Sequence, residues 1–354
     1  MKTSEQAYLS RGVSPTKDEV KAAVKDQDKG IFPGAFCKVI EDMAGDDDYC
    51  TVVHADGAGT KSSAAYMMAE ETGDLSWYRG IAQDSLVMNI DDMMCVGATG
   101  PFYVSNTIGR NAHRVSGAAI AEVIRGYDEI IARLKEYGVD IKMTGGETAD
   151  VGDLVSTLIC DSTVVTRIKR SDVINCADMK PGLTIVGLAS FGQASYETAE
   201  NSGIASNGLT AARHLLLNKV YREKYPEAYS DTLKEEQVFV GPYQLTEPLP
   251  DSTLTAGEAI LSPTRSFLPV MLDVFKHHRA DIHALIHCTG GGLVKCRDFG
   301  HGIRYVKDNL FERPAIFNAI AATGEIGAKE MYQVFNLGQR LEIYCDEHVA
   351  EDII

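Results

Sequence analysis

The stretch from Cys50 to Ser63 constrains the fold of this chain most strongly, because a short apolar segment runs directly into a polar, glycine-containing loop. Residues 51–55, Thr-Val-Val-His-Ala, have the β-branched and apolar character of a buried strand. The loop that follows, Asp56-Gly-Ala-Gly-Thr-Lys61, combines a carboxylate, two glycines, a hydroxyl and a lysine. Its glycines let backbone N–H groups approach an anion, its aspartate can hold a divalent cation, and its lysine supplies positive charge. The stretch therefore predicts a site for a metal-bound nucleotide phosphate.

An ordinary turn is the alternative interpretation of the same loop, since Asp-Gly-x-Gly is common turn chemistry. Two familiar nucleotide fingerprints do not fit. Lys61 follows Thr60 rather than a glycine, which excludes a Walker loop, and Ser62 stands where a dinucleotide fingerprint has its third glycine. A phosphate site at this loop must belong to another class.

Bulk composition limits the partners and the compartment. The 354 residues suffice for two domains, and the formal net charge of −16 argues against a nucleic acid or an anionic membrane as partner. The eight cysteines include no CxxC pair, which indicates buried thiols in a reducing compartment. The sequence opens on no signal peptide and has no apolar run near the ~20 residues of a membrane span. These features predict a cytoplasmic protein.

The first half alternates strands and helices, which predicts an α/β pattern. Residues 1–48 are polar and predict a mobile arm that ends in a glycine-containing loop, with a solvated leader as the alternative. Apolar residues recur at helical spacing over residues 80–96 and 115–138. Residues 141–143 predict a short strand leading into a second polar glycine loop over residues 144–150, and a long strand follows over residues 154–168.

Two adjacent carboxylates, Asp91 and Asp92, lie in the helix predicted over residues 80–96. They follow Met88-Asn89-Ile90, and their apolar setting makes a metal role for one of them an alternative to simple solvation. Asp84 returns to about the same face of this helix. The sequence leaves open which of the adjacent pair would face a metal.

The second half begins after a polar connection at residues 171–181, where we place a domain boundary, with a buried strand over residues 182–190. Ser206-Asn207-Gly208 precedes a helix predicted over residues 209–217, so it can seat an anion or simply cap the helix. A strand over residues 282–288 runs into a third glycine loop at Thr289. Residues 333–336 and 340–345 are strand-like. The histidines at 277, 278, 283 and 287 lack zinc-helix spacing and are interpreted as surface or core residues.

Seven motifs occur in an order that resembles the aminoimidazole ribonucleotide synthetase family, the phosphoribosylformylglycinamidine cyclo-ligases of purine biosynthesis. The motifs are Asp56-Gly-Ala-Gly-Thr-Lys61, Asp91-Asp92, Gly145-Gly-Glu-Thr148, Ser206-Asn-Gly208, Ser262-Pro-Thr-Arg265, Thr289-Gly-Gly-Gly292 and Met331-Tyr-Gln-Val-Phe-Asn-Leu-Gly338. The N-terminal motifs are shared with a wider superfamily that includes thiamine monophosphate kinase. The C-terminal motifs are the ones similar to the cyclo-ligases.

The resemblance implies an α/β (α+β) fold with two domains, residues 1–170 for ATP binding and dimerisation and residues 171–354 for substrate binding. It further implies a homodimer whose N-terminal domains form a shared β-barrel, and a C-terminal sheet flanked by helices. The implied enzyme is a magnesium-dependent ligase. It would close formylglycinamidine ribonucleotide to aminoimidazole ribonucleotide and release ADP and phosphate.

The resemblance also implies roles for individual residues. Asp56, Asp92 and Glu147 would hold Mg²⁺ and the polyphosphate, and Lys61 would neutralise the transferring phosphate. Gly57, Gly59 and Thr60 would cradle that phosphate, and the loop from Gly34 to Phe36 would close over ATP. Ser206, Asn207 and Gly208 would seat the substrate's ribose phosphate, with the loop of Thr289, Gly290 and Gly291 helping to bind the substrate.

Three departures from the family pattern keep alternatives open. Ala205 stands before Ser-Asn-Gly, where the family commonly has a histidine, and Gln339-Arg340 follows Gly338, where another glycine is expected. The sequence also stops at Ile354, where relatives continue. A small-molecule kinase of the same superfamily and a non-catalytic nucleotide-binding paralogue are therefore the competing hypotheses.

Overall fold

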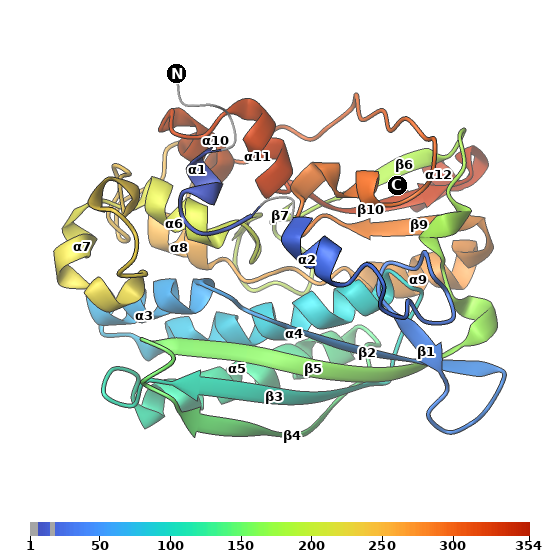
Figure 1. Cartoon of the computed structure of the whole chain (residues 1–354), viewed down its shortest axis with the longest axis horizontal. Helices are drawn as coiled ribbons and strands as arrows, with labels where there is room; N and C mark the ends of the chain where they lie inside the picture. Colours follow the sequence, from blue (N-terminus) through green and yellow to red (C-terminus); the bar gives the residue numbers. More distant parts are fainter. Residues whose placement is uncertain (1–5, 15–17) are drawn as a thin grey trace.

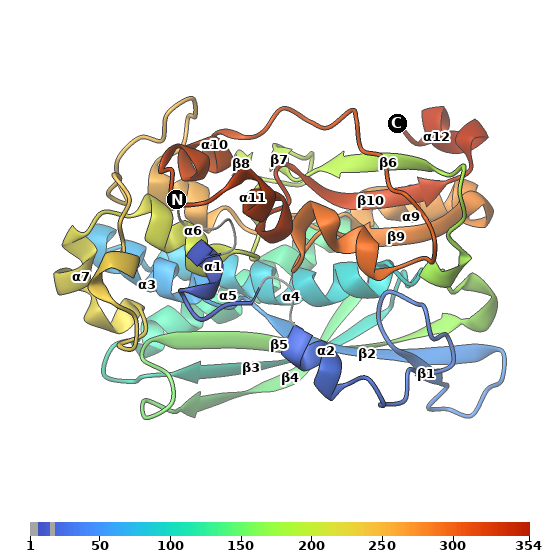
Figure 2. The same ribbon diagram turned by 45° about the horizontal axis from the view of Figure 1, so that its top comes forward.

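The computed structural model describes residues 6–14 and 18–354. A five-stranded sheet forms one side of the molecule, and helices α3, α4 and α5 cover one face of it (Figure 1). The C-terminal half lies on the far side of α4, so that this helix runs between the two sheets (Figure 2). The elements of the first half are α1 (Gln6–Leu9), α2 (Asp18–Ala23), β1 (Val39–Glu41), β2 (Tyr49–Gly57), α3 (Lys61–Thr72), α4 (Arg79–Met94), β3 (Phe102–Arg110), α5 (Gly117–Glu136), β4 (Ile141–Asp150) and β5 (Leu158–Lys169).

The large sheet has the strand order β1-β2-β5-β3-β4, with β3 and β4 parallel and the other neighbours antiparallel. In β5, Cys160, Ser162 and Val164 are buried under the helices, while Ile159 and Thr163 alternate to an exposed face. This alternation is what a half-buried strand requires. The sheet is open and does not close into a barrel within the chain.

Strand β4 corrects one prediction. We expected a short strand and then a loop over residues 144–150, but the strand continues through Asp150 and pairs with β3. Gly146 lies so close to β3 that an added Cβ would stand 2.7 Å from the backbone oxygen of Asn106. The glycine therefore serves close strand approach here, a requirement that resembles a loop signal in sequence.

The C-terminal half is built on a three-stranded antiparallel sheet in the order β6-β10-β9. Its elements are β6 (Thr184–Ala189), β7 (Phe191–Gly192), β8 (Asn201–Ser202), α6 (Leu209–Leu216), α7 (Val220–Lys224), α8 (Ala256–Leu261), α9 (Leu268–His278), β9 (Ile282–His287), α10 (Ala315–Ala322), α11 (Ala328–Val334), β10 (Gln339–Cys345) and α12 (Glu347–Ile353). The strand expected at residues 333–336 is wrong, because α11 reaches Val334. Met331 and Val334 are buried at helical spacing.

The N-terminal arm is docked where the structure describes it. The backbone N–H of Tyr8 donates to Oε1 of Glu330 at 2.8 Å, and Nε of Arg11 donates to the carbonyl of Gln237 at 3.0 Å. The prediction of a mobile arm is therefore wrong for residues 6–14, and part of it falls on residues outside the described chain. No helix among the described residues is long and apolar enough to span a membrane.

Candidate active site

Helix α4 carries three buried carboxylates that connect the two halves of the molecule: Asp84, Asp91 and Asp92. Asp84 and Asp92 are eight positions apart, which corresponds to about 12 Å along the helix axis. Each carboxylate has different partners. Together they define a candidate site that follows α4 through the interior of the chain.

Asp84 is a clamp. Its Oδ1 accepts hydrogen bonds from the backbone N–H of Thr264 at 2.7 Å and from the Thr264 hydroxyl at 2.6 Å. The Ser206 hydroxyl donates to the same oxygen at 3.0 Å, and the Lys61 ammonium does so at 2.9 Å. The Ser-Pro-Thr-Arg motif and the Ser-Asn-Gly motif thus meet on one carboxylate, which holds the C-terminal half against α4.

Lys61 is fully buried beside this clamp. Besides Asp84, its ammonium donates to the carbonyls of Ser262 at 2.5 Å and Ala205 at 3.3 Å, so all three N–H donors have protein acceptors. Burial lowers the pKa of Lys61 and the charge of Asp84 opposes that shift. In this geometry Lys61 holds the Ser206 and Ser262 loops against α4, and its predicted contact with phosphate stays a prediction.

Asp91 and Asp92 have separate tasks. Asp91 accepts hydrogen bonds from the Ser266 hydroxyl at 2.7 Å and from the Phe267 N–H at 3.0 Å. Its Oδ2 also lies 3.6 Å from Nη2 of Arg340, and burial raises the pKa of Asp91 to about 6. Asp91 therefore anchors the start of α9, which leaves Asp92 as the member of the pair that faces the site.

Asp92 accepts a hydrogen bond from Nδ1 of His287 at 2.5 Å. Arg340 contacts the other ring nitrogen of His287 through Nη1. Because arginine can only donate, Nε2 of His287 must be the acceptor and Nδ1 must carry the proton. Burial and the charge of Arg340 lower the pKa of His287 to about 4. Burial raises the pKa of Asp92, but His287, Lys295 and His54 outweigh it and bring that pKa below its usual value, so a neutral imidazole faces an ionised carboxylate.

His54 approaches Asp92 from strand β2, with Nε2 lying 3.5 Å from Oδ2 of Asp92. The amide of Asn89 donates to the carbonyls of Asp56 and Ser85 at 3.1 and 2.9 Å, so its Oδ1 faces Nδ1 of His54 at 2.9 Å. The amide therefore fixes the hydrogen of His54 on Nδ1 and points Nε2 at the carboxylate.

Two helix N-termini meet at the other end of the site. The Asp56 loop ends at the start of α3, and the Ser206 loop ends at the start of α6. The hydroxyls of Thr60 and Thr210, 150 positions apart, form a hydrogen bond of 3.0 Å. The two loops for which phosphate binding was predicted separately therefore lie side by side, each leading into a helix N-terminus, where anions are favoured.

The Thr289 loop joins the Asp92 end through Lys295. The Lys295 ammonium donates to the Thr289 hydroxyl at 2.7 Å and lies 4.4 Å from the ring centroid of Phe36. The Phe36 ring stacks on Phe299 with centroids 5.5 Å apart. The predicted ATP-closing loop and the predicted substrate loop, which also includes Gly290 and Gly291, are thus brought together.

Two carboxylates, Asp56 and Asp161, lie at the end of β2. Asp161, opposite Gly57 in the sheet register, lies so close that a Cβ on Gly57 would stand 1.7 Å from its Oδ1. Burial and the charge of Asp56 raise the pKa of Asp161, so the two carboxylates influence each other. Neighbouring carboxylate oxygens are the ligands that Mg²⁺ prefers.

Glu147 is not brought to this cluster within one chain. It is exposed on β4, which β5 and β3 separate from β2. Three strand spacings amount to about 14 Å. The predicted metal set of Asp56, Asp92 and Glu147 therefore does not converge in a single copy.

Sequence reasoning missed His54, His287, Lys295 and Arg340, which contact Asp92 or order its partners. It also missed Asp161, which lies next to Gly57 at the end of β2. His287 was interpreted as a surface or core residue, and it is a buried partner of Asp92. Its position at the end of the strand leading into the Thr289 loop was the available signal. Arg340 was noted only as a departure from an expected glycine.

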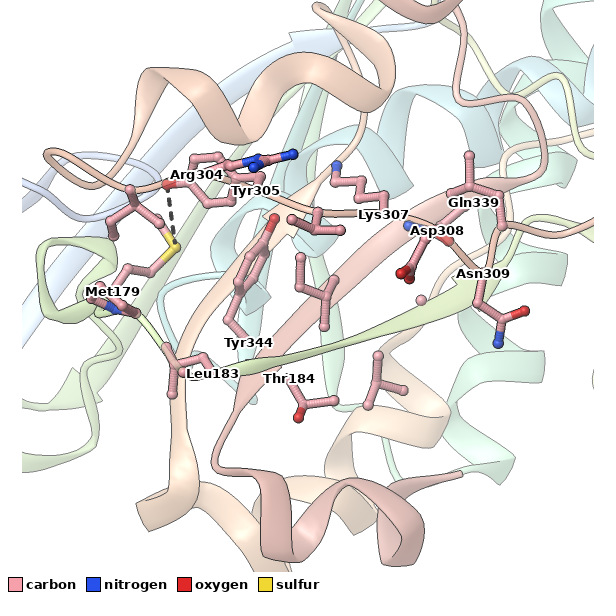
Figure 3. A pocket seen from close by; sticks show the side chains of 18 of the residues that line it. Met179, Leu183, Thr184, Arg304, Tyr305, Lys307, Asp308, Asn309, Gln339 and Tyr344 are labelled. Carbon is pink, nitrogen blue, oxygen red and sulfur yellow. Dashed lines mark hydrogen bonds between the residues drawn. The ribbon is translucent and has the colours of Figure 1, made fainter.

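A cavity of about 630 Å³ lies elsewhere, between β6 and residues 303–311 (Figure 3). Lys307 and Tyr344 lie on its wall and both contact the buried Glu342. None of the site residues predicted from the sequence lines it. We therefore assign the candidate active site to the region along α4.

Comparisons with known proteins test the resemblance drawn from the motifs. Residues 34–168 match the family model described as AIR synthase related protein, N-terminal domain. The chain is 29% identical over 346 residues to a phosphoribosylformylglycinamidine cyclo-ligase of Methanococcus vannielii, covering 97% of this chain and 82% of that protein. A cyclo-ligase of Methanocaldococcus jannaschii is 28% identical over 308 residues, covering 87% and 74%. The resemblance drawn from the motifs is confirmed.

Solved structures give the fold. Phosphoribosylformylglycinamidine synthase II of Thermotoga maritima superposes with a TM-score of 0.50 at 12% identity, covering 98% of this chain and 44% of that one. A chain of a HypE–HypF complex also gives 0.50, at 11% identity, covering 94% and 86%. At these identities the likeness shows a shared mixed α/β fold.

Proposed function

We propose that this chain, which carries the AIR synthase related N-terminal domain and is similar along most of its length to the cyclo-ligases, is an ATP-dependent phosphoribosylformylglycinamidine cyclo-ligase of purine biosynthesis. The proposal rests on one observation: the Asp56 loop and the Ser206 loop, each predicted to bind a phosphate, meet at the hydrogen bond between Thr60 and Thr210. One loop would hold the polyphosphate of ATP and the other the ribose phosphate of formylglycinamidine ribonucleotide. Two anionic substrates would then lie side by side, as phosphoryl transfer between them requires.

The reaction has two steps. The formyl oxygen of formylglycinamidine ribonucleotide attacks the γ-phosphorus of ATP, and ADP leaves. An amidine nitrogen of the same molecule then attacks the formyl carbon and the C–O bond to phosphate breaks. Loss of the N–H protons of the attacking and the formamide nitrogens, with transfer of a methylene proton to the exocyclic imine, gives the aminoimidazole. In such transfers the protein mainly positions groups and stabilises developing charge.

The residues of the chain divide these tasks. Gly57, Gly59 and Thr60 present backbone and hydroxyl donors to the polyphosphate, and Lys61 keeps the two loops in register through Asp84. Asp92, held ionised by His287, faces the Thr289 loop and stabilises positive charge that develops on the amidine nitrogen during ring closure. The Phe36 loop covers the nucleotide.

Asp56 and Asp161 are the carboxylates we assign to Mg²⁺, which would neutralise charge on the transferring phosphate. Asp92 would not bind this ion directly. Its carboxylate lies 3.5 Å from Nε2 of His54 and would add negative charge near the metal site. Glu147 would reach the metal-bound phosphate only if it belonged to a second copy of the chain.

We further propose the two domains 1–170 and 171–354 and a homodimer built from the open faces of the large sheets. Large apolar side chains are exposed there, with Val53 45%, Tyr103 43% and Ile159 39% accessible. An apolar sheet face of this kind fits a second apolar surface. In such a dimer Glu147 would face the partner subunit. A cytoplasmic location fits the free thiols of all eight cysteines.

The test is ADP release with magnesium-ATP, measured with and without formylglycinamidine ribonucleotide, alongside an assay for the closed imidazole. ADP and imidazole formed in equal amounts are expected. A phosphorylated, open product would instead select the kinase hypothesis. ATP binding without any turnover would select the non-catalytic paralogue.

A further inference from the structure

Two Asp-x-His sequences meet at one end of the C-terminal sheet, away from the site along α4. Asp281-Ile-His283 enters β9, and Asp346-Glu-His348 leaves β10 and enters α12. The two segments are fixed to each other, because the N–H of Asp346 donates to the carbonyl of Asp281 at 3.0 Å and Cys345 pairs with Ile282. Four potential metal ligands are therefore held on a rigid backbone.

The ligand atoms of these side chains converge. Asp281, Asp346 and His348 each direct one ligand atom into a group in which all distances are within 4.8 Å. Nε2 of His283 lies 3.1 Å from Oδ1 of Asp346, and Nε2 of His348 lies 3.6 Å from Oδ1 of Asp281. Small side-chain rotations bring such a group to the separations found around a tetrahedral ion.

Protein contacts leave these atoms with unused capacity. Asp346 occupies the N-cap position of α12, yet its side chain accepts no capping hydrogen bond, although aspartate is a preferred capping residue. Nε2 of His283 is buried and faces Oδ1 of the Asp346 carboxylate at 3.1 Å. Lys180 is the nearby cation, and its ammonium stays 3.8 Å from Asp346.

We propose that Asp281, His283, Asp346 and His348 bind one Zn²⁺ ion, which fastens α12 to the β9–β10 edge of the C-terminal sheet. Two imidazoles with two carboxylates match the borderline ligand preference of zinc, whereas Mg²⁺ prefers oxygen ligands alone. An ion between two close carboxylates also removes their mutual repulsion. The His348 side chain is 71% exposed, so an ion at this position is reached directly from solvent.

The site is independent of the proposed reaction, so its test is metal binding rather than turnover. The full chain, stripped with a chelator, is titrated with Zn²⁺ by calorimetry and with Co²⁺ by absorption spectroscopy. We expect one ion per chain, a tetrahedral Co²⁺ spectrum, and no competition from millimolar Mg²⁺. Thermal unfolding should shift to higher temperature with Zn²⁺.

Variants locate the ion. Asp346→Asn and His348→Ala should each lower Zn²⁺ affinity by at least about tenfold and remove the thermal shift. His277→Ala is the matched control, because His277 lies 3.6 Å from Asp273 on the surface with the same His–Asp chemistry but no further ligand. An affinity that Asp346→Asn and His348→Ala leave unchanged, or that His277→Ala lowers equally, overturns the proposal even if Zn²⁺ binds elsewhere on the chain.

Discussion

Nδ1 of His287 lies 2.5 Å from Oδ1 of Asp92, while Arg340 occupies the opposite ring nitrogen of the same histidine. The guanidinium can only donate hydrogen bonds, so the ring nitrogen that it contacts must accept. The ring proton of His287 therefore lies on the nitrogen that faces the carboxylate. A residue on β10 thus determines which ring nitrogen of His287, on β9, carries the proton that faces the Asp92 carboxylate on α4. The Asp92 carboxylate, which faces the Thr289 loop, is consequently held in place and ionised before any substrate binds.

Substitution of Asp92 should lower activity, whereas substitution of the adjacent Asp91 should lower stability. Asp92→Asn removes the charge that faces the site and should lower kcat by about a hundredfold with little loss of folded structure. Asp91→Asn leaves Arg340 without its carboxylate in the interior and should lower the free energy of unfolding by about 3 kcal/mol. Steady-state kinetics and urea unfolding of both variants make the comparison. Equal effects of the two substitutions on both measurements would contradict the assignment.

Lys61→Met should destabilise the protein, because it leaves the Asp84 carboxylate buried without its cation. Removing one partner of a buried pair typically costs about 3–5 kcal/mol. Lys38→Met is the control, since Lys38 and Asp28 form a solvent-exposed pair whose loss should change the stability little. Urea unfolding measures both. Wild-type stability of Lys61→Met, together with a raised KM for ATP, would favour direct phosphate contact over the positioning role.

Gly57→Ala should weaken ATP binding, because the new methyl group would displace the Asp161 carboxylate and press on the carbonyl of Cys160 at 2.8 Å. We expect the KM for magnesium-ATP to rise by about tenfold. Gly117→Ala is the matched control: nothing lies within 4 Å of its added methyl group, and alanine suits the first turn of α5. An unchanged KM for magnesium-ATP in Gly57→Ala would mean that Asp161 is not a ligand of the metal.

The open sheet face gives a prediction about assembly. Tyr103→Asp introduces charge into the exposed apolar face and should convert a dimer into monomers in sedimentation experiments. Leu154→Asp is the control, because Leu154 is 86% exposed but lies after the end of β4 rather than within the sheet. A monomeric wild-type chain would remove the proposed interface and with it the role of Glu147.

The elements with strong periodicity could be predicted from the sequence, and those ordered by tertiary contacts could not. Helices α4 and α5 lie within two residues of the expected bounds, because a long apolar stripe at helical spacing seldom forms anything but a helix. The continuation of β4 through Gly145 and Gly146 was missed, since glycine marks both loops and close strand approach. The individual loops of the site were recognised, whereas the pairing of Asp92 with His287 depends on contacts 195 positions apart.

His214 should make the protein sensitive to acid. It is buried against Phe239, whose N–H donates to its Nδ1 at 3.3 Å, and burial with the nearby Arg213 charge lowers the pKa of His214 to about 2. In the unfolded chain a histidine has a pKa near 6.5, so between those two values the unfolded state binds a proton that the folded state does not. The stability associated with neutral His214 is therefore complete above about pH 6.5 and declines below it, by up to about 1.4 kcal/mol per pH unit.

His214→Gln tests this sensitivity, because its amide oxygen can accept the Phe239 N–H without titrating. Urea unfolding at pH 7.5, 6 and 5 should show the stability difference between wild type and variant shifting in favour of the variant as the pH falls. His277→Gln, at an exposed position, serves as the comparison and should show a much smaller shift. Parallel pH profiles for wild type and His214→Gln would mean that His214 accepts its proton in the folded state, which requires water to reach the space between α6 and Phe239.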